Sequence, residues 1–310
     1  MKYIAQTFKG LEQVTEKELS GKKITDRRIE YTKSKKEIKT VLLSYELIKK
    51  IKFKNFKDLL KKVENSKINI KGTFRVDCSK EENSKINTQQ VRETIGEIFF
   101  KKGNKVNLDN PNFTIFLDIY KNTCFLGMNP KTYKRDYKVR SSRDSINSSL
   151  GASLLKIAKL KKTDTLLDPF CSDGVILIEA GLFGAKKLYG LAEDTKNASI
   201  NSKVAKVKIN LSKNELDWLD TSFKEKSVDK IITKPLFFSK RRSKEDVYKT
   251  TKELFHQTKY ILKKNGLLLT LCPKTELLEK YAKEYKFKAK KETEVQVGDL
   301  LYKINSFKKI

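Results

Sequence analysis

The sequence predicts an α/β protein built around a mostly parallel, doubly wound sheet. Residues 166–180 begin with apolar residues that end at Asp168, pass through a turn that closes at Gly174, and continue as a helical pattern. Two more strand patterns, at residues 187–194 and 228–238, are each followed by a helical pattern. Strands that alternate with helices in this way are typical of parallel sheets covered by helices on both faces. In such sheets ligands bind beyond the carboxyl ends of the strands.

Size and hydropathy place the chain in a broad class. Its 310 residues allow two or three domains, and a hydrophobic content of 38% supports a substantial core. No apolar run approaches the roughly 20 residues that span a bilayer. Residues 1–6 lack the apolar centre of a signal peptide. We therefore expect a cytoplasmic protein that makes no membrane contact.

The charge predicts a polyanionic partner. Lys and Arg number 68 against 38 for Asp and Glu, which gives a formal net charge of +30. The excess is spread along the whole chain, which favours RNA as the partner. The alternative is a lysine-rich composition that only decorates solvated surfaces.

Cysteine and histidine usage predicts no metal site. Four cysteines are far apart and form no Cys-x-x-Cys pair, and the chain has a single histidine, His256. Zinc sites need clusters of such ligands at short spacing. We expect buried free thiols, and a surface or packing role for His256 in its helical stretch.

Two small α+β segments are predicted before the doubly wound sheet. Residues 1–65 open with a strand pattern at 3–8 and a helix pattern that follows Gly10. Residues 66–130 combine a strand, a helix over 88–100 that Asn87 can cap, an Asn-Pro turn and a hairpin. A generic α+β domain is the alternative for this second segment.

A basic linker is predicted at residues 131–147, where cations alternate with tyrosines. Cations neutralise phosphates while aromatic rings stack on bases or cover apolar seams, so this pattern favours RNA contact, or a position beside the ligand site, over a solvated connector. The candidate RNA-binding residues here are Lys134, Arg135, Lys138, Arg140 and Arg143.

The loop after the first parallel strand carries a family resemblance. Residues 168–175 read Asp-Pro-Phe-Cys-Ser-Asp-Gly-Val. This resembles the cofactor loop of class I S-adenosylmethionine-dependent RNA methyltransferases, above all the subgroup with a THUMP domain that modifies the exocyclic amine of guanine in tRNA or rRNA. The resemblance implies a ferredoxin-like domain (1–65), a THUMP domain (66–130), the linker (131–147) and a Rossmann-like methyltransferase domain (148–310). It also implies tRNA as the RNA, bound by the THUMP domain.

The same resemblance implies S-adenosylmethionine as cofactor, although the loop departs from the family pattern. The implied cofactor-binding residues are Asp168, Phe170, Ser172, Gly174, Glu193, Asp194 and Glu215. Ser172 replaces a glycine at a position that calls for left-handed backbone. Ala192 stands where relatives carry the acid that binds the ribose, with Glu193 and Asp194 directly after it.

The loop that holds the target base in relatives has changed as well. The family reads Asn/Asp-Pro-Pro-Tyr, and the matching residues here are Lys234, Pro235, Leu236 and Phe237. Phe237 can still stack on an extruded base. A charged Lys234 is only a donor and cannot accept the hydrogen of the base's amine.

Together these changes predict an RNA-binding protein that keeps a methyltransferase fold with weakened or lost catalysis, and that could act as partner to an active subunit. The alternative is an active tRNA or rRNA guanine methyltransferase. The basic residues Lys240, Arg241 and Arg242 would extend the RNA-binding surface in either case.

Overall fold

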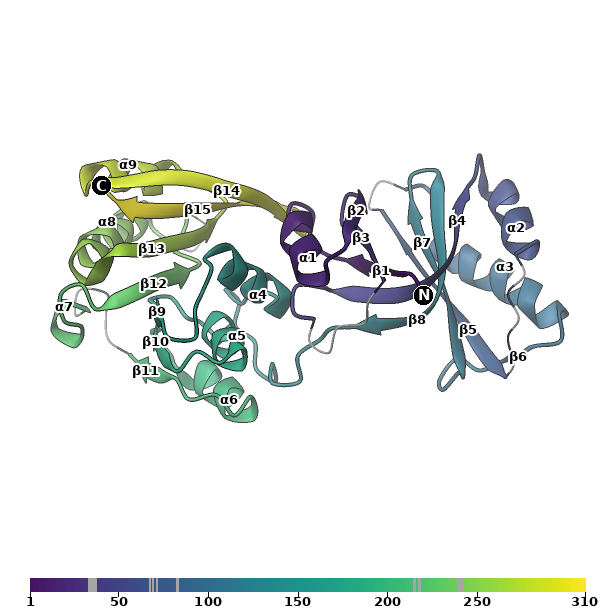
Figure 1. The fold of residues 1–310 in the computed structure, drawn as a ribbon, viewed down its shortest axis with the longest axis horizontal. Coiled ribbons are helices and arrows are strands. Elements are labelled where there is room, and N and C mark those ends of the chain that lie inside the picture. Colours follow the sequence, from purple (N-terminus) through teal and green to yellow (C-terminus); the bar gives the residue numbers. More distant parts are fainter. Residues whose placement is uncertain are drawn as a thin grey trace. The chain divides into compact units, whose positions relative to one another are not determined.

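A computed structural model describes residues 1–32, 38–66, 68, 70, 72–81, 84–213, 216, 219–238 and 242–310. The chain divides into two compact units, each with its own sheet (Figure 1). Unit 1 comprises Met1–Gln6, Leu19–Lys36 and Val41–Thr132. Unit 2 comprises Thr7–Glu18, Glu37–Thr40 and Tyr133–Ile310.

Unit 1 is a single mixed sheet with two helices among its described residues. Its elements are β1 (Tyr3–Gln6), β2 (Lys22–Thr25), β3 (Arg28–Tyr31), β4 (Leu43–Lys52), α2 (Phe56–Glu64), β5 (Thr73–Lys80), α3 (Thr88–Lys101), β6 (Lys105–Val106), β7 (Phe113–Tyr120) and β8 (Thr123–Thr132). The strand order is β2-β3-β1-β4-β8-β7-β5-β6. The pairing of β4 with β8 joins the strands that precede α2 to the strands that follow it in one sheet.

Helix α3 of unit 1 forms where the sequence pattern predicts it. Asn87 caps α3, since its side-chain oxygen accepts hydrogen bonds from the backbone N–H groups of Gln89 and Gln90. The apolar face of α3 packs in one hydrophobic core with α2 and the inner strands, through Val91, Ile95 and Phe99 among others. The predicted helix and the predicted hairpin of β7 and β8 are both confirmed.

A buried ion pair ties four strands of unit 1 together. Arg28 on β3 donates from Nε to Asp118 Oδ2 on β7 at 2.8 Å. Tyr45 on β4 and Ser79 on β5 also donate to the Asp118 carboxylate, at 2.9 and 3.1 Å. Every oxygen of this buried charge therefore has a donor, which is what makes its burial tolerable.

Unit 2 contains the remaining elements. They are α1 (Glu12–Leu19, its residues through Glu18), α4 (Ser148–Ile157), β9 (Thr165–Asp168), α5 (Val175–Phe183), β10 (Lys187–Leu191), α6 (Lys196–Val204), β11 (Asn210–Ser212), α7 (Leu219–Ser222), β12 (Val228–Thr233), α8 (Lys244–Ile261), β13 (Leu262–Cys272), α9 (Glu276–Glu284), β14 (Phe287–Val297) and β15 (Leu300–Lys309).

The sheet of unit 2 confirms the predicted doubly wound fold. Its order is β11-β10-β9-β12-β13-β15-β14, and the strands from β9 to β13 run parallel. The last strand, β15, lies between β13 and β14 and is antiparallel to both. The strand order reverses between β9 and β12 (Figure 1), so a ligand is expected beyond the carboxyl ends of these two strands.

Three smaller features of the sequence can be placed in the fold. His256 is exposed on α8 with its ring against Tyr285, as predicted. All four cysteines are free and buried, also as predicted, and burial raises the pKa of Cys78 to about 12. In the part of the chain that the structure describes, none of the helices has the length and apolar character needed to cross a bilayer.

Candidate functional site

The ends of β9 and β12 meet through Asp168. Thr233, the last residue of β12, donates its hydroxyl to Asp168 Oδ1 at 2.6 Å, and the backbone N–H of Phe170 donates to the same oxygen at 3.2 Å. Asp168 is buried, and this burial raises its pKa from 3.8 to about 7. Parallel strands thus bring the predicted cofactor loop beside the predicted base loop, 65 residues apart in sequence.

The turn between β9 and α5 uses left-handed backbone at two positions. Gly174 has φ 84°, and a Cβ there would lie 3.2 Å from Ala198 Cβ. Ser172 has φ 54°, so this non-glycine residue does adopt the left-handed backbone expected at its position. Such a residue costs on the order of 1 kcal/mol, so the rest of the turn must hold it in place.

Asp173 is a buried acid with an unused oxygen. Its Oδ2 has no hydrogen-bond partner among the described residues, and Lys138 Nζ, a cation near it, lies 3.9 Å away. Lys138 itself donates to the Ile146 carbonyl at 2.6 Å. A buried carboxylate oxygen without a donor fits a ligand ammonium, such as the amino group at the methionine end of S-adenosylmethionine.

The space at this site is nevertheless small. The cavity has a volume of about 10 Å³, close to the minimum for one water molecule. Its lining includes Asp144, Ile146, Asp168, Phe170, Ser172, Asp173 and Lys234. The hydroxyls of Ser142, on the linker, and Ser172, on the turn between β9 and α5, are hydrogen-bonded to each other, so the linker contacts this turn. The polar groups of this site therefore fit the cofactor. The cavity is too small to hold it, however, unless residues 142–146 move.

Lys234 points into the site and not into bulk water. Its side chain is 12% exposed. The Nζ lies 3.2 Å from the Asp144 carbonyl oxygen and 3.6 Å from Asp144 Oδ1. It also lies 5.8 and 5.9 Å from the ring centroids of Phe237 and Tyr302. Burial lowers the pKa of Lys234, and the Asp144 carboxylate opposes that shift.

Asp144 links the base loop to the predicted basic surface. Arg242 donates to Asp144 Oδ2, so this carboxylate faces two cations. The pairing holds the pKa of Asp144 below its ordinary value despite partial burial. Lys240 and Arg241, the other predicted RNA-binding residues of this stretch, lie outside the described residues.

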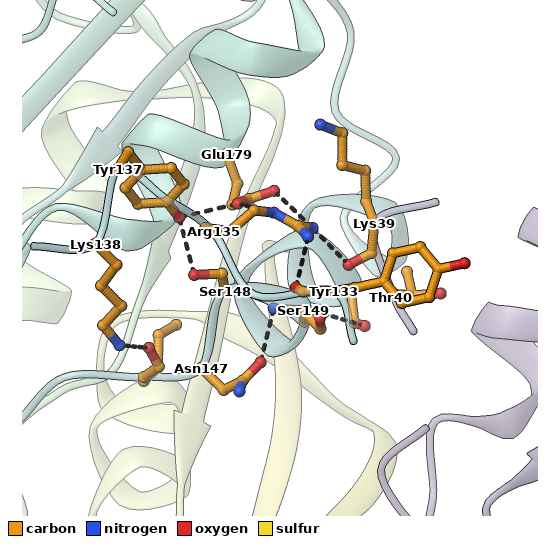
Figure 2. A network of polar contacts seen from close by, with 12 residues as sticks. Lys39, Thr40, Tyr133, Arg135, Tyr137, Lys138, Asn147, Ser148, Ser149 and Glu179 are labelled. Atoms are coloured by element: carbon orange, nitrogen blue, oxygen red, sulfur yellow. Dashed lines mark hydrogen bonds and ion pairs between the residues drawn. The ribbon is translucent and has the colours of Figure 1, made fainter. Parts of the chain in front are cut away.

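Arg135 lies in an interior network that the basic pattern of the linker did not indicate. Its Nε donates to Glu179 Oε1 at 2.9 Å, and its two terminal nitrogens donate to the carbonyls of Tyr133 and Lys39 at 2.9 Å each (Figure 2). Tyr137 donates its hydroxyl to the same Glu179 oxygen at 2.9 Å. The side chains of Arg135 and Glu179 are 10% and 1% exposed. These donors are therefore used inside unit 2.

Glu179 is absent from the residues predicted for the site, although a signal is present in the sequence. It is a lone acid within the apolar run of α5, and it is buried there. An acid in an otherwise apolar buried helix needs a partner. The run identifies the acid, but nothing local identifies Arg135, 44 residues earlier, as its partner.

Other predicted residues lie apart from this network. Lys134, Arg140 and Arg143 are exposed and can meet phosphates from solvent. The backbone of Arg140 is held by Asn201, whose amide also donates to the Asp173 carbonyl. The remaining predicted cofactor acids are Glu193 and Asp194, which are exposed after β10, and Glu215, which is outside the described residues.

The buried Asp168 predicts a particular pH dependence. Between about pH 4 and pH 7 the folded chain keeps a proton on Asp168 that the unfolded chain has released, so the free energy of unfolding should fall as pH rises through this window. The amide introduced by Asp168→Asn cannot titrate. Denaturant titrations at pH 5 and pH 8 should therefore show wild type losing more stability at pH 8 than the variant does. Equal losses would contradict the raised pKa.

Comparison with known proteins identifies the family. A family model described as the RMKL-like methyltransferase domain matches residues 135–303, more than half of the chain. The chain belongs to the RMKL-like methyltransferase family. A THUMP domain model matches residues 45–129. The methyltransferase domain thus coincides with the doubly wound sheet of unit 2, and the THUMP match falls in unit 1.

Individual relatives agree with this assignment. The chain is 30% identical over 244 residues to the tRNA (guanine(10)-N2)-dimethyltransferase of Methanocaldococcus jannaschii, covering 71% of this chain and 68% of that protein. It is 23% identical to the U6 snRNA (guanine-N(2))-methyltransferase THUMPD2 of Bos taurus, covering 84% of this chain but 54% of that protein. The crystal structure of TrmN from Thermus thermophilus shares the fold, with a TM-score of 0.84, 20% identity and coverage of 100% and 99%.

Proposed function

We propose that this member of the RMKL-like methyltransferase family binds RNA, most simply tRNA, and that its own methyl transfer to guanine is weak or lost. A protein that binds RNA without modifying it would act as a scaffold, and a partner subunit with an intact base loop could supply catalysis. The single observation that carries the loss of activity is the position of Lys234.

RNA binding has three lines of support. A THUMP domain model matches the chain, and relatives at 23–30% identity are named for activity on tRNA or U6 snRNA. The formal net charge is +30. The exposed cations Lys134, Arg140 and Arg143 precede the methyltransferase site on the linker. Such cations release counterions when they neutralise phosphates, and this release drives binding.

The chemistry at Lys234 argues against methyl transfer. An exocyclic amine that attacks a methyl group gains positive charge on nitrogen, so its neighbours should accept hydrogen bonds. Lys234 presents an ammonium, which is donor-only, beside the rings of Phe237 and Tyr302. The nearby Asp144 carboxylate is already paired with Lys234 and Arg242.

An active guanine methyltransferase is the second candidate, and two observations favour it. Asp144 places carboxylate oxygens beside the base loop, where they could accept the amine's hydrogen once Lys234 turns away. Oδ2 of Asp173, which accepts no hydrogen bond from the described residues, suits the amino group of S-adenosylmethionine, with Gly174 allowing close approach. The cofactor would supply the methyl group. Residues 142–146 would have to shift for it to enter the cavity.

The test combines binding with turnover. We expect tRNA affinity to fall by about 10³-fold between 50 and 200 mM salt, as for a protein that contacts six or more phosphates. Incubation of tRNA with the wild-type protein and labelled S-adenosylmethionine should leave the RNA with little or no label. An affinity that salt barely changes would refute RNA binding as proposed, and rapid labelling of guanine would establish the second candidate.

A further inference from the structure

A second cavity lies in unit 2, apart from the one at Asp168. It has a volume of about 240 Å³ and is formed by the loop after β12, the first turns of α8, the end of β13 and α9. Among the described residues, its lining and that of the cavity of Asp168 and Lys234 have no member in common. Its size is below the roughly 300–1,000 Å³ that holds a drug-sized molecule, so it suits a ligand of one or two rings.

Aromatic side chains form the walls of this cavity. The ring centroids of Phe238 and Tyr248 are 5.7 Å apart with an interplanar angle of 51°. Phe237, the residue predicted to stack on the target base, also contributes to the lining. Tyr248 is 43% exposed although it is a large aromatic residue on a helix. Exposed rings at the mouth of a concave site offer flat apolar surface on which a planar ligand can stack.

Charged groups surround the rings and suit a phosphodiester strand. Lys280 Nζ lies 5.8 Å from the centroid of the Tyr248 ring, and Lys274 also lines the cavity. Both lysines are exposed, as is Glu276, the one acid among the lining residues that the structure describes. A base that stacks on Tyr248 would place its flanking phosphates near the lysines, and Glu276 could accept a hydrogen bond from a base amine.

We propose that this cavity binds an unpaired nucleobase of the bound RNA on Phe238 and Tyr248, in addition to any base that stacks on Phe237 beside Lys234. The proposal rests on the proposed RNA-binding function and adds a specific contact to it. An unpaired base is required because the ring faces of paired bases are already stacked within the duplex. The protein would thereby prefer RNA with a single-stranded segment next to the contacted helix.

The test compares two tyrosines of α8. Tyr248 lines the cavity, whereas Tyr260, on the same helix and 41% exposed, does not. The full chain and its Tyr248→Ala, Tyr248→Phe and Tyr260→Ala variants are titrated with a single-stranded RNA about 12 nucleotides long, within the site sizes of single-strand binders, and with a duplex RNA of equal phosphate number. Thermal melts establish that each variant is folded.

Tyr248→Ala should weaken binding of the single strand about 10-fold or more, with little change for the duplex. Tyr248→Phe should restore the affinity because it keeps the ring, and Tyr260→Ala should bind like wild type. Equal affinities of Tyr248→Ala and wild type for the single strand would overturn the nucleobase site while leaving RNA binding intact. If wild type bound neither RNA, the proposed function itself would fail.

Discussion

Replacing Lys234 with asparagine is expected to raise methyl transfer to tRNA by about 100-fold, the size of effect that one well-placed polar group has on a charged transition state. The change removes an ammonium from beside Phe237 and Tyr302 and supplies an amide oxygen that can accept the hydrogen of the target amine. Asp144 keeps Arg242 as its partner, so the substitution leaves no unpaired acid there. The measurement is label incorporated into guanine at saturating S-adenosylmethionine.

Lys234→Met separates the two parts of this effect. Methionine removes the charge but supplies no oxygen acceptor, so its rate should stay near that of wild type if the acceptor is what the base loop lacks. A rate for Lys234→Met equal to that of Lys234→Asn would mean that charge alone blocks the reaction. A wild-type protein that labels guanine rapidly, at a rate that neither variant exceeds, would show that Lys234 is compatible with catalysis, and the proposal of weakened activity would fall.

The fold of the methyltransferase domain follows from local sequence patterns. The strand ending at Asp168, the turn that closes at Gly174 and the helix after it are contiguous, so periodicity and turn residues indicate all three. Helix α1 can be predicted from the local sequence pattern of residues 11–19 in the same way. The contacts of this segment cannot be predicted locally, because they are made with residues far away in the chain. Thr40 donates its hydroxyl to Glu18, and Thr293 donates its hydroxyl to the Gly10 carbonyl.

The candidate site was only partly predictable for the same reason. The resemblance pointed to Lys234 because its neighbours Pro235 and Phe237 match a family loop, and the left-handed backbone at Ser172 follows from the turn. No local pattern indicates that Asp144 would pair with Lys234, 90 residues later in the chain. Charge alone also cannot distinguish an exposed cation from one held in an interior network, as Lys134 and Arg135 show.

These two neighbours give the second large prediction. Arg135→Met is expected to lower the free energy of unfolding of unit 2 by about 3–5 kcal/mol, because it leaves the buried Glu179 carboxylate without its cation. Lys134→Met, at an exposed position, should change it by no more than about 0.5 kcal/mol. Denaturant unfolding followed by circular dichroism measures both, and the double variant Arg135→Met, Glu179→Met should recover part of the loss.

For RNA affinity the two substitutions should rank the other way, with the larger effect at Lys134 and the smaller at Arg135. At a temperature where both variants are folded, Lys134→Met should weaken tRNA binding and reduce its salt dependence, because an exposed cation is lost. Arg135→Met should bind nearly as well as wild type, since the donors of Arg135 are used by Glu179 and by the carbonyls of Tyr133 and Lys39. A stable Arg135→Met protein with strongly weakened RNA binding would instead place this guanidinium on the RNA, and the interior network of Figure 2 would have to open when RNA binds.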